Sequence, residues 1–269
     1  MKLYIIVFVL AVQTTLFSAC QVSKIELGPK TEVKSYLEKE FEMEDSTSLN
    51  LSCDSSNIEV YVWDEKTIKF EVAKRVRGVW KREELEKDLD NFLVEIYEKE
   101  NEIIFKSEYR GKNKSPADRN IDLTLYMPKK IEGITLEIGT GNIKFHDNIR
   151  GKLNGEIGMA NMEVAGFYGE IGIEGNIGNI TISSGRLEGE TYIKKNIGNI
   201  CINAKFEEGG NYLFKTDIGN IELALPGDSK ISFESIGELE INDFDDFSYD
   251  TKAHVETSVG KIAIRKTGE

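Results

Sequence analysis

A short signature that places apolar residues on either side of one variable position recurs seven times in the second half of this 269-residue chain. One copy is Gly178-Asn179 followed by Ile180-Thr181-Ile182. The outer two residues of the triplet are apolar in every copy, whereas the middle residue varies. Such period-two alternation indicates a strand with one buried and one exposed face. The aligned polar positions, 18 to 23 residues apart, are Asn142, Asn161, Asn179, Asn199, Asn220, Glu238 and Lys261.

Most copies also have a glycine directly before the aligned position. Glycine takes positive φ without a Cβ clash, so this position predicts a structural corner of the chain. Asparagine tolerates such corners, and the five aligned asparagines would stack as a ladder if successive copies lie on one another. Ala160 replaces the glycine in one copy, and the other six have Gly141, Gly178, Gly198, Gly219, Gly237 and Gly260.

The segments between the signatures contain a second alternating strand, for example over residues 190–193 and 212–214. Residues 133–266 therefore predict an all-β, β-helix-like solenoid, a single coil of about seven rungs that pair with one another at ~4.8 Å. A β-sandwich with strands every ~8–12 residues is the alternative. The corner signature favours the solenoid. In that fold, the middle residues of the triplets would be the only ones free to meet a ligand.

Residues 41–132 predict a β-rich region with one short helix near residues 81–92. Ser56-Asn57-Ile58-Glu59-Val60 echoes the repeat signature without its glycine. Leu85, Leu89 and Phe92 recur at helical spacing. An open end of a solenoid exposes unpaired backbone, so we expect this helix to cover it.

The N-terminus has the features of an export signal. Lys2 precedes an apolar stretch that is too short to span a bilayer, and Leu16-Phe17-Ser18-Ala19-Cys20 follows. This ending resembles the lipobox of bacterial lipoproteins, although Phe17 stands where leucine is usual. We predict a signal peptide over 1–19, lipidation of Cys20, a tether over 20–40 and an extracytoplasmic, membrane-anchored location. An ordinary secretory signal cleaved nearby, or an uncleaved anchor, is the alternative.

The charge of the chain restricts its partners. Removal of residues 1–19 takes away one of 34 basic residues and none of 47 acidic ones, so the mature charge is 33 − 47 = −14. Such a surface repels nucleic acid and anionic lipid headgroups, so we expect no nucleic-acid partner and a covalent membrane attachment through the N-terminal lipid. Cys53 and Cys201 lie far apart in sequence, and we predict that both are free thiols.

Candidate chemical groups are few. His146 and His254 would lie several rungs apart and could not share a metal ion or a proton relay, so we expect no cofactor. Residues 242–250 hold the densest run of acids, and clustered carboxylates suit calcium. The candidate weak calcium ligands are Asp243, Asp245, Asp246 and Asp250, with a solvated turn as the alternative.

An enzyme acting on polysaccharide is the main catalytic alternative. Glu163, Glu222 and Glu240 are outward middle residues, and chain order would place Glu222 and Glu240 on adjacent rungs at ~4.8 Å. That separation is near the ~5–5.5 Å of a retaining glycosidase pair. An acidic, soluble strand face gives the same pattern, and no aromatic sugar platform is evident beside them. We therefore predict no enzymatic activity.

These motifs together resemble the bacterial putative adhesin family of domains of unknown function, which is related to the head-GIN auto-transporter-like adhesin domains. The resemblance covers about residues 42–266 and depends on the ordered recurrence of the Ile-Gly-Asn-Ile series, on residues 57–60 and 121–145, and on Leu225-Pro226-Gly227-Asp228. It implies a β-solenoid and supplies no catalytic residues. We expect an interaction, adhesion or scaffold role with an envelope protein or glycan. The alternatives are a polysaccharide-active enzyme and an accessory protein of an envelope-stress signalling system.

Overall fold

The computed structural model describes residues 30–112, 117–244 and 248–268. The chain divides into two units, Met1–Lys30 and Thr31–Glu269, and all of the described strands belong to the second. The predicted signal peptide, Cys20 and the first part of the predicted tether lie outside the described residues. Within the described ranges, no helix has the length and apolar character needed to cross a membrane.

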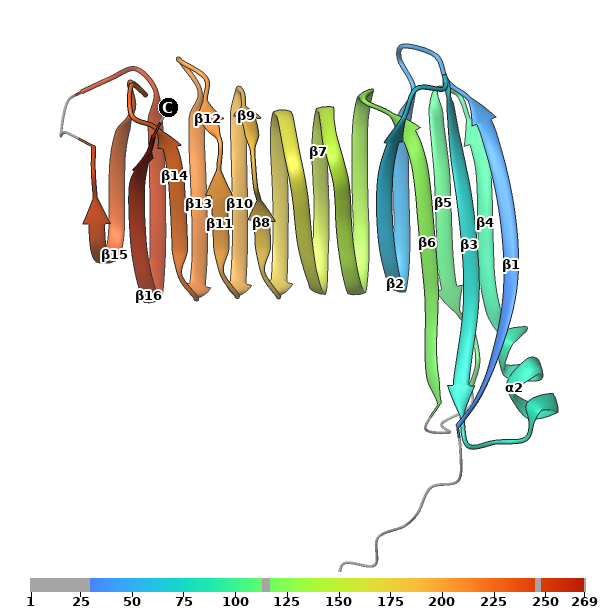
Figure 1. Ribbon diagram of the computed structural model, residues 1–269. Helices are drawn as coiled ribbons and strands as arrows, with labels where there is room; N and C mark the ends of the chain where they lie inside the picture. The colour runs from blue at the N-terminus through green and yellow to red at the C-terminus, as the bar shows by residue number, and fades with distance from the viewer. Residues whose placement is uncertain (1–29, 113–116, 245–247, 269) are drawn as a thin grey trace, which may run out of the picture. The chain divides into compact units, whose positions relative to one another are not determined.

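The unit is all-β apart from one described helix. Its N-terminal strands adjoin in the order β1-β3-β6-β2, and β2 continues the sheet into the repeats (Figure 1). The strands β4 and β5 form an antiparallel pair, and β5 pairs with β2. The elements are β1 (Thr31–Glu42), β2 (Ser48–Trp63), β3 (Thr67–Gly78), α2 (Arg82–Leu89), β4 (Phe92–Lys99), β5 (Glu102–Tyr109) and β6 (Asp118–Pro128).

The repeat strands pair in parallel, and up to β14 each pairs with the strand about one repeat away. For example, Ile193 pairs with Ile173 on one side and with Phe214 on the other. The first passes of the chain form one continuous, coiled strand, β7, and the later passes are divided into shorter strands (Figure 1). The elements are β7 (Lys130–Ile177), β8 (Ile180–Ile182), β9 (Gly185–Leu187), β10 (Glu190–Ile197), β11 (Ile200–Asn203), β12 (Lys205–Phe206), β13 (Asn211–Ile218), β14 (Ile221–Pro226), β15 (Ser232–Asn242) and β16 (Lys252–Thr267).

The strands of the repeats form three faces. The Gly-Asn corner lies between the first and the second face, and a short third face holds β9 and β12, which pair with each other and, through β9, with β7. The first face holds residues that precede the corner, such as those of β10 and β13, and the second face holds those that follow it, such as β11 and β14. The apolar outer residues of the triplets are buried in six of the seven copies, as predicted. The exception is β15, where Leu239 is 47% exposed.

A further copy of the repeat comes from the N-terminal region. The segment Ser56–Val60 of β2 pairs in parallel with the first copy in β7, so that Asn57 lies opposite Asn142 and Ile58 opposite Ile143. The echo of the signature at these residues is therefore structural. A Ser56 in place of the corner glycine is accommodated there.

The last strand is not last in space. The strand β16 lies between β14 and β15, because Glu222 of β14 pairs with Ala263 while Leu239 of β15 pairs with Ile262. The prediction that Glu222 and Glu240 are neighbours is therefore wrong, since a whole strand separates them. The signature reports which residues turn and which are buried, but it carries no information on the order in which the copies stack.

The N-terminal region departs from the sequence prediction at one place. Residues 31–40, predicted as tether, belong to the edge strand β1, which pairs antiparallel with β3 over its whole length. Backbone pairing holds this charged strand in the sheet, and only Val33 is fully buried. The predicted helix is present as α2, which packs on β1 and β3 through Leu85 and Leu89, while Phe92 begins β4.

Candidate binding groove

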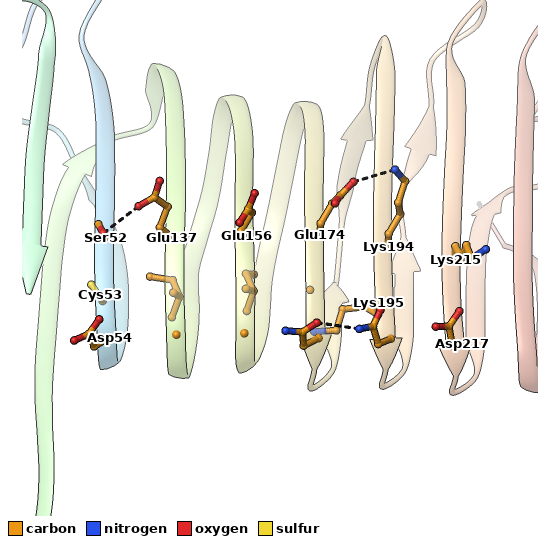
Figure 2. A pocket seen from close by; sticks show the side chains of 17 residues that line it. Ser52, Cys53, Asp54, Glu137, Glu156, Glu174, Lys194, Lys195, Lys215 and Asp217 are labelled. Atoms are coloured by element: carbon orange, nitrogen blue, oxygen red, sulfur yellow. Dashed lines mark hydrogen bonds and ion pairs between the residues drawn. The ribbon is translucent and has the colours of Figure 1, made fainter. Parts of the chain in front are cut away.

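A row of mostly charged side chains runs across the first face, and each successive pass of the chain contributes one of them (Figure 2). The row is acidic on the passes of β7 and continues with lysines on β10 and β13. Its register follows from Ser52 opposite Glu137, Glu174 opposite Lys194 and Lys215 opposite Glu256. The charged members are Glu137, Glu156, Glu174, Lys194, Lys215 and Glu256, and the uncharged Ser52 ends the row on β2.

Neighbouring members of this charged row bind one another where their charges are opposite. The Lys194 ammonium lies 2.9 Å from a Glu174 oxygen, and Lys215 lies 2.9 Å from Glu256. The hydrogen bond from Lys215 lowers the pKa of Glu256, and the same contact raises the pKa of Lys215. On the acidic side, Ser52 Oγ donates a 3.1 Å hydrogen bond to Glu137. Glu156 has no hydrogen bond or ion pair among the described residues, so it is available to a ligand.

Beside the charged row the surface is hollowed into a groove of about 850 Å³. Its floor includes Gly139 and Gly158, which are stacked on successive passes of β7. A Cβ at Gly158 would lie 2.2 Å from the carbonyl oxygen of Gly139, so no larger residue fits there. The polar residues Asp54, Asn176, Asn196 and Asp217 also line the groove. Its glutamate, lysine and amide groups offer charges and hydrogen-bond donors and acceptors to a polar or charged ligand.

One lysine of the groove points inward. Lys195 is only 2% exposed, and its Nζ atom has no hydrogen-bond partner among the described residues. Its side chain lies over Gly175, where an added Cβ would be 2.7 Å from Nζ. Burial lowers the pKa of Lys195 to about 8, because desolvation disfavours the charged form.

The asparagine ladder is present at the corner. Asn161 Nδ2 donates to Asn142 Oδ1 at 3.2 Å, and in the later passes each asparagine oxygen accepts from the backbone nitrogen of the next corner residue. The ladder continues through Asn57 to Asp122 on one side and ends at the backbone nitrogen of Lys261 on the other. The six corner glycines have φ between +124° and +152°.

The histidines lie on different strands of different faces. His146 stacks on Tyr61 with a ring-centroid distance of 4.3 Å and lies near Glu59, whereas His254 lies between Glu234 and Glu256. Cys201 is half-buried on the second face between Thr181 and Glu222, as its position in the signature predicts. Cys53 is buried in β2, and both cysteines are free thiols.

The acidic segment near residue 245 is only partly described. Asp243 accepts a hydrogen bond from the backbone nitrogen of Lys266, which ties the end of β15 to β16. Asp250 is exposed, and Asp245 and Asp246 lie outside the described residues. In the described part of the chain, no three His, Cys, Asp or Glu side chains are grouped closely enough to hold a metal ion.

An aromatic row on the second face is not apparent from the sequence. Tyr126 of β6, Tyr61 of β2 and His146 of β7 stack across three adjacent strands, and Trp63 stacks on Tyr126 at 5.5 Å. The parallel insertion of β2 between β6 and β7 brings these residues together. Because each ring face is turned to its neighbour, the row presents ring edges rather than a flat platform to solvent.

The corner exposes more than the triplets suggest. Four of the six corner glycines follow an apolar residue that points outward and lies in register with the others on adjacent strands. These residues are Ile177, Ile197, Ile218 and Val259, and they are 43–62% exposed. The expectation that only the middle residues can meet a ligand is therefore wrong. The isoleucine before the glycine recurs visibly in the sequence. Whether its side chain is buried or exposed, however, depends on the geometry of the corner, which the sequence does not show.

No protein-family model matches the sequence, and no curated protein matches it. The structure is similar to solved bacterial structures at low identity. They include a putative cell adhesion protein from Clostridium sporogenes (15% identity, TM-score 0.39, 87% of this chain and 100% of the other). Putative adhesins from Bacteroides fragilis (12% identity) and Parabacteroides merdae (10% identity) each have a TM-score of 0.41, with 87% of this chain and 97% of the other covered.

Proposed function

We propose that this chain is a lipid-anchored, extracytoplasmic β-solenoid that binds another envelope component through the groove of its first face, without catalysis. In this proposal Cys20 carries the lipid, the seven signature copies and the segment of β2 form the rungs, and the charged row selects the partner. The role is adhesion or scaffolding. Its ligand is an envelope protein or glycan with groups complementary to a block of carboxylates followed by ammonium groups.

The charged row is the observation that carries this proposal. It places acidic and basic groups at a regular ~4.8 Å spacing over six passes of the chain, which suits an extended partner rather than a small substrate. The glycine floor beside it gives such a partner room to approach the backbone. The net charge of −14 expected after removal of residues 1–19 favours a basic or neutral partner at the acidic half of the row.

A polysaccharide-cleaving activity has less support. The pair Glu222 and Glu240 is separated by β16. The carboxylates that do lie on successive passes, such as Glu137 and Glu156, are both exposed. A glycosidase acid needs an environment that keeps it protonated, and an apolar pocket is the usual means.

A retention assay with charge-reversal variants tests the proposal. Full-length lipoprotein is immobilised and challenged with envelope fragments from the producing bacterium. We expect Glu137→Lys with Glu156→Lys to lower retention at least about tenfold, a change of ~1.4 kcal/mol. Glu163→Lys with Glu240→Lys makes the same charge change on the second face and should leave retention unchanged.

The same samples are assayed for released reducing sugar. Turnover that disappears in Glu156→Gln would contradict a non-catalytic role. Equal retention by all charge variants would contradict the groove as the binding surface.

A further inference from the structure

The segment Lys74–Arg82, hereafter the basic turn, has a charge opposite to that of the rest of the chain. It contains five basic residues and no acidic residue, in a chain with a net charge of −13. The basic turn joins β3 to α2, and its centre is Gly78-Val79-Trp80. The basic residues are Lys74, Arg75, Arg77, Lys81 and Arg82.

The basic turn projects beyond the repeat corners at one end of the sheet. Ala73 pairs with Asp122, which pairs with Asn57 at the level of the Gly-Asn corner. Gly78 is five residues further along β3, so it lies ~17 Å past that level. Figure 1 shows β1, β3 and β6 extending past the turns of the repeat strands on this side, with α2 beside them.

The apolar centre of the basic turn is turned to solvent. Trp80 is 40% exposed and Val79 is 36% exposed. Exposed Arg77 and Lys81 flank them. Neither is in an ion pair within the described residues, although Arg77 lies opposite Glu32 and Asp118 on the neighbouring strands. Arg75 lies near Glu32 and Asp122, and Arg82 pairs with Glu86, so only part of the positive charge is compensated.

The chain enters the described unit at the same place. Thr31, the first residue of β1, pairs with Gly78 in the basic turn. Cys20 and Lys30 are ten residues apart, and that length of chain spans at most ~36 Å. A lipid on Cys20 would therefore hold the basic turn within reach of the bilayer that contains it.

We propose that the basic turn is a membrane-contact site that inserts Trp80 at the surface of an anionic bilayer and binds its phosphate headgroups through Arg77 and Lys81. This inference rests on the lipid anchor of the proposed function. Tryptophan is enriched at membrane interfaces, and each basic residue near an anionic surface contributes ~1 kcal/mol. The acidic remainder of the unit is repelled by the same surface, so the contact orients the groove away from the bilayer.

The two tryptophans of the chain provide matched reporters. Trp63 pairs with Pro128 at one end of β6, and the basic turn is paired with Asp118 at the other end, so ~33 Å of strand separates the two levels. The single-tryptophan variants Trp63→Phe and Trp80→Phe of the full-length lipoprotein are reconstituted in vesicles of phosphatidylcholine and phosphatidylglycerol with brominated acyl chains. We expect Trp80 fluorescence to shift to the blue and to lose most of its intensity, while Trp63 is unchanged.

Charge variants test the headgroup contact. Arg77→Gln with Lys81→Gln should abolish the extra quenching seen on adding phosphatidylglycerol, whereas Lys205→Gln with Lys252→Gln, away from the basic turn, should not. Both pairs are exposed, so the fold is retained. Intact-mass measurement of acylation at Cys20, with Cys20→Ala as control, is made on the same samples.

Acylated protein with unquenched Trp80 would overturn the membrane contact while leaving the anchor intact. Unacylated protein would overturn the anchor and the contact together. If Trp80 is not quenched and the protein self-associates, the basic turn contacts a second protein molecule. That result would also contradict the proposal.

Discussion

The side-chain oxygen of Asn199 accepts a 2.8 Å hydrogen bond from the backbone nitrogen of Asn220, one repeat further along the chain. The backbone N–H of Asn199 in turn donates a hydrogen bond to the side-chain oxygen of Asn179. Each corner residue therefore satisfies a backbone group of its neighbour, and the ladder joins adjacent passes where the strand ladder is interrupted by the turn.

Replacement of Asn199 by alanine should lower the free energy of unfolding by about 0.5–1.5 kcal/mol, because the backbone N–H of Asn220 loses its acceptor. The control is Asn196→Ala, in the same repeat, whose side chain bonds only the side chain of Asn176 among the residues that the structure describes. That change should cost under ~0.5 kcal/mol. Urea denaturation of both variants measures the difference, and equal costs would show that the ladder adds no stability.

The corner glycines should tolerate no side chain. Gly198 has a φ of +137°, and an added Cβ would lie 1.9 Å from the carbonyl oxygen of Gly178. Gly198→Ala should therefore destabilise the protein by about 3 kcal/mol or more. Gly227→Ala is the matched control, since the nearest atom to its Cβ would be 3.8 Å away. Thermal unfolding at one scan rate compares them, and a similar melting temperature for both variants would refute the corner argument.

The buried Lys195 should reduce stability near neutral pH. Lys195→Met removes an unpartnered ammonium while it keeps an unbranched side chain over Gly175, so we expect a gain of about 1–3 kcal/mol at pH 7. Urea denaturation at pH 7 measures it. A loss of stability in this variant would indicate that Lys195 has a stabilising partner.

The same variant has a defined pH dependence. The pKa of Lys195 is lowered to about 8, below its unfolded value near 10.4. The unfolded chain then binds more protons between these values, so the wild type becomes more stable as pH rises from about 8 to about 10.5. The advantage of Lys195→Met should shrink across that window. A constant advantage would mean that Lys195 does not titrate there.

The position of β16 can be tested by disulfide formation. In a Cys201→Ser background, Glu222→Cys with Ala263→Cys places thiols on paired residues, within the Cα separation of ~4.4–6.8 Å that a disulfide allows. Mild oxidation should cross-link this pair. Glu222→Cys with Glu240→Cys, separated by β16, should stay reduced. The reverse result would restore the stacking in chain order.

Local features of the repeat could be predicted from the sequence, because they depend on neighbours along the chain. The burial of Ile180 and Ile182 follows from alternation, and the helix around Leu85 and Leu89 follows from its spacing. The pairing of β1 with β3 could not be read from a charged segment, because the partners of its side chains, such as Phe70 beside Phe41 and Lys69 beside Glu38, are known only once the two strands are paired. The position of β16 depends on the order of strands that are far apart in sequence, and the signature contains no information on that order.

The site was less predictable than the fold. Glu137, Glu156 and Glu174 are ordinary outward residues of separate passes, and only the register shows that they form one row. The burial of Lys195 depends on Gly175 in the adjacent strand. The basic turn, by contrast, has five basic residues and no acidic residue within nine positions, so charge patterning alone could have identified it.

Carboxyl footprinting of the full-length lipoprotein, with and without envelope fragments from the producing bacterium, tests the proposed binding surface most directly. Carbodiimide coupling to each glutamate is read by peptide mass spectrometry. We predict that binding reduces labelling of Glu137, Glu156 and Glu174 on the first face and leaves Glu163, Glu222 and Glu240 on the second face unchanged. Protection confined to the second face, or no protection of the first face in a sample that is fully bound, would contradict the account.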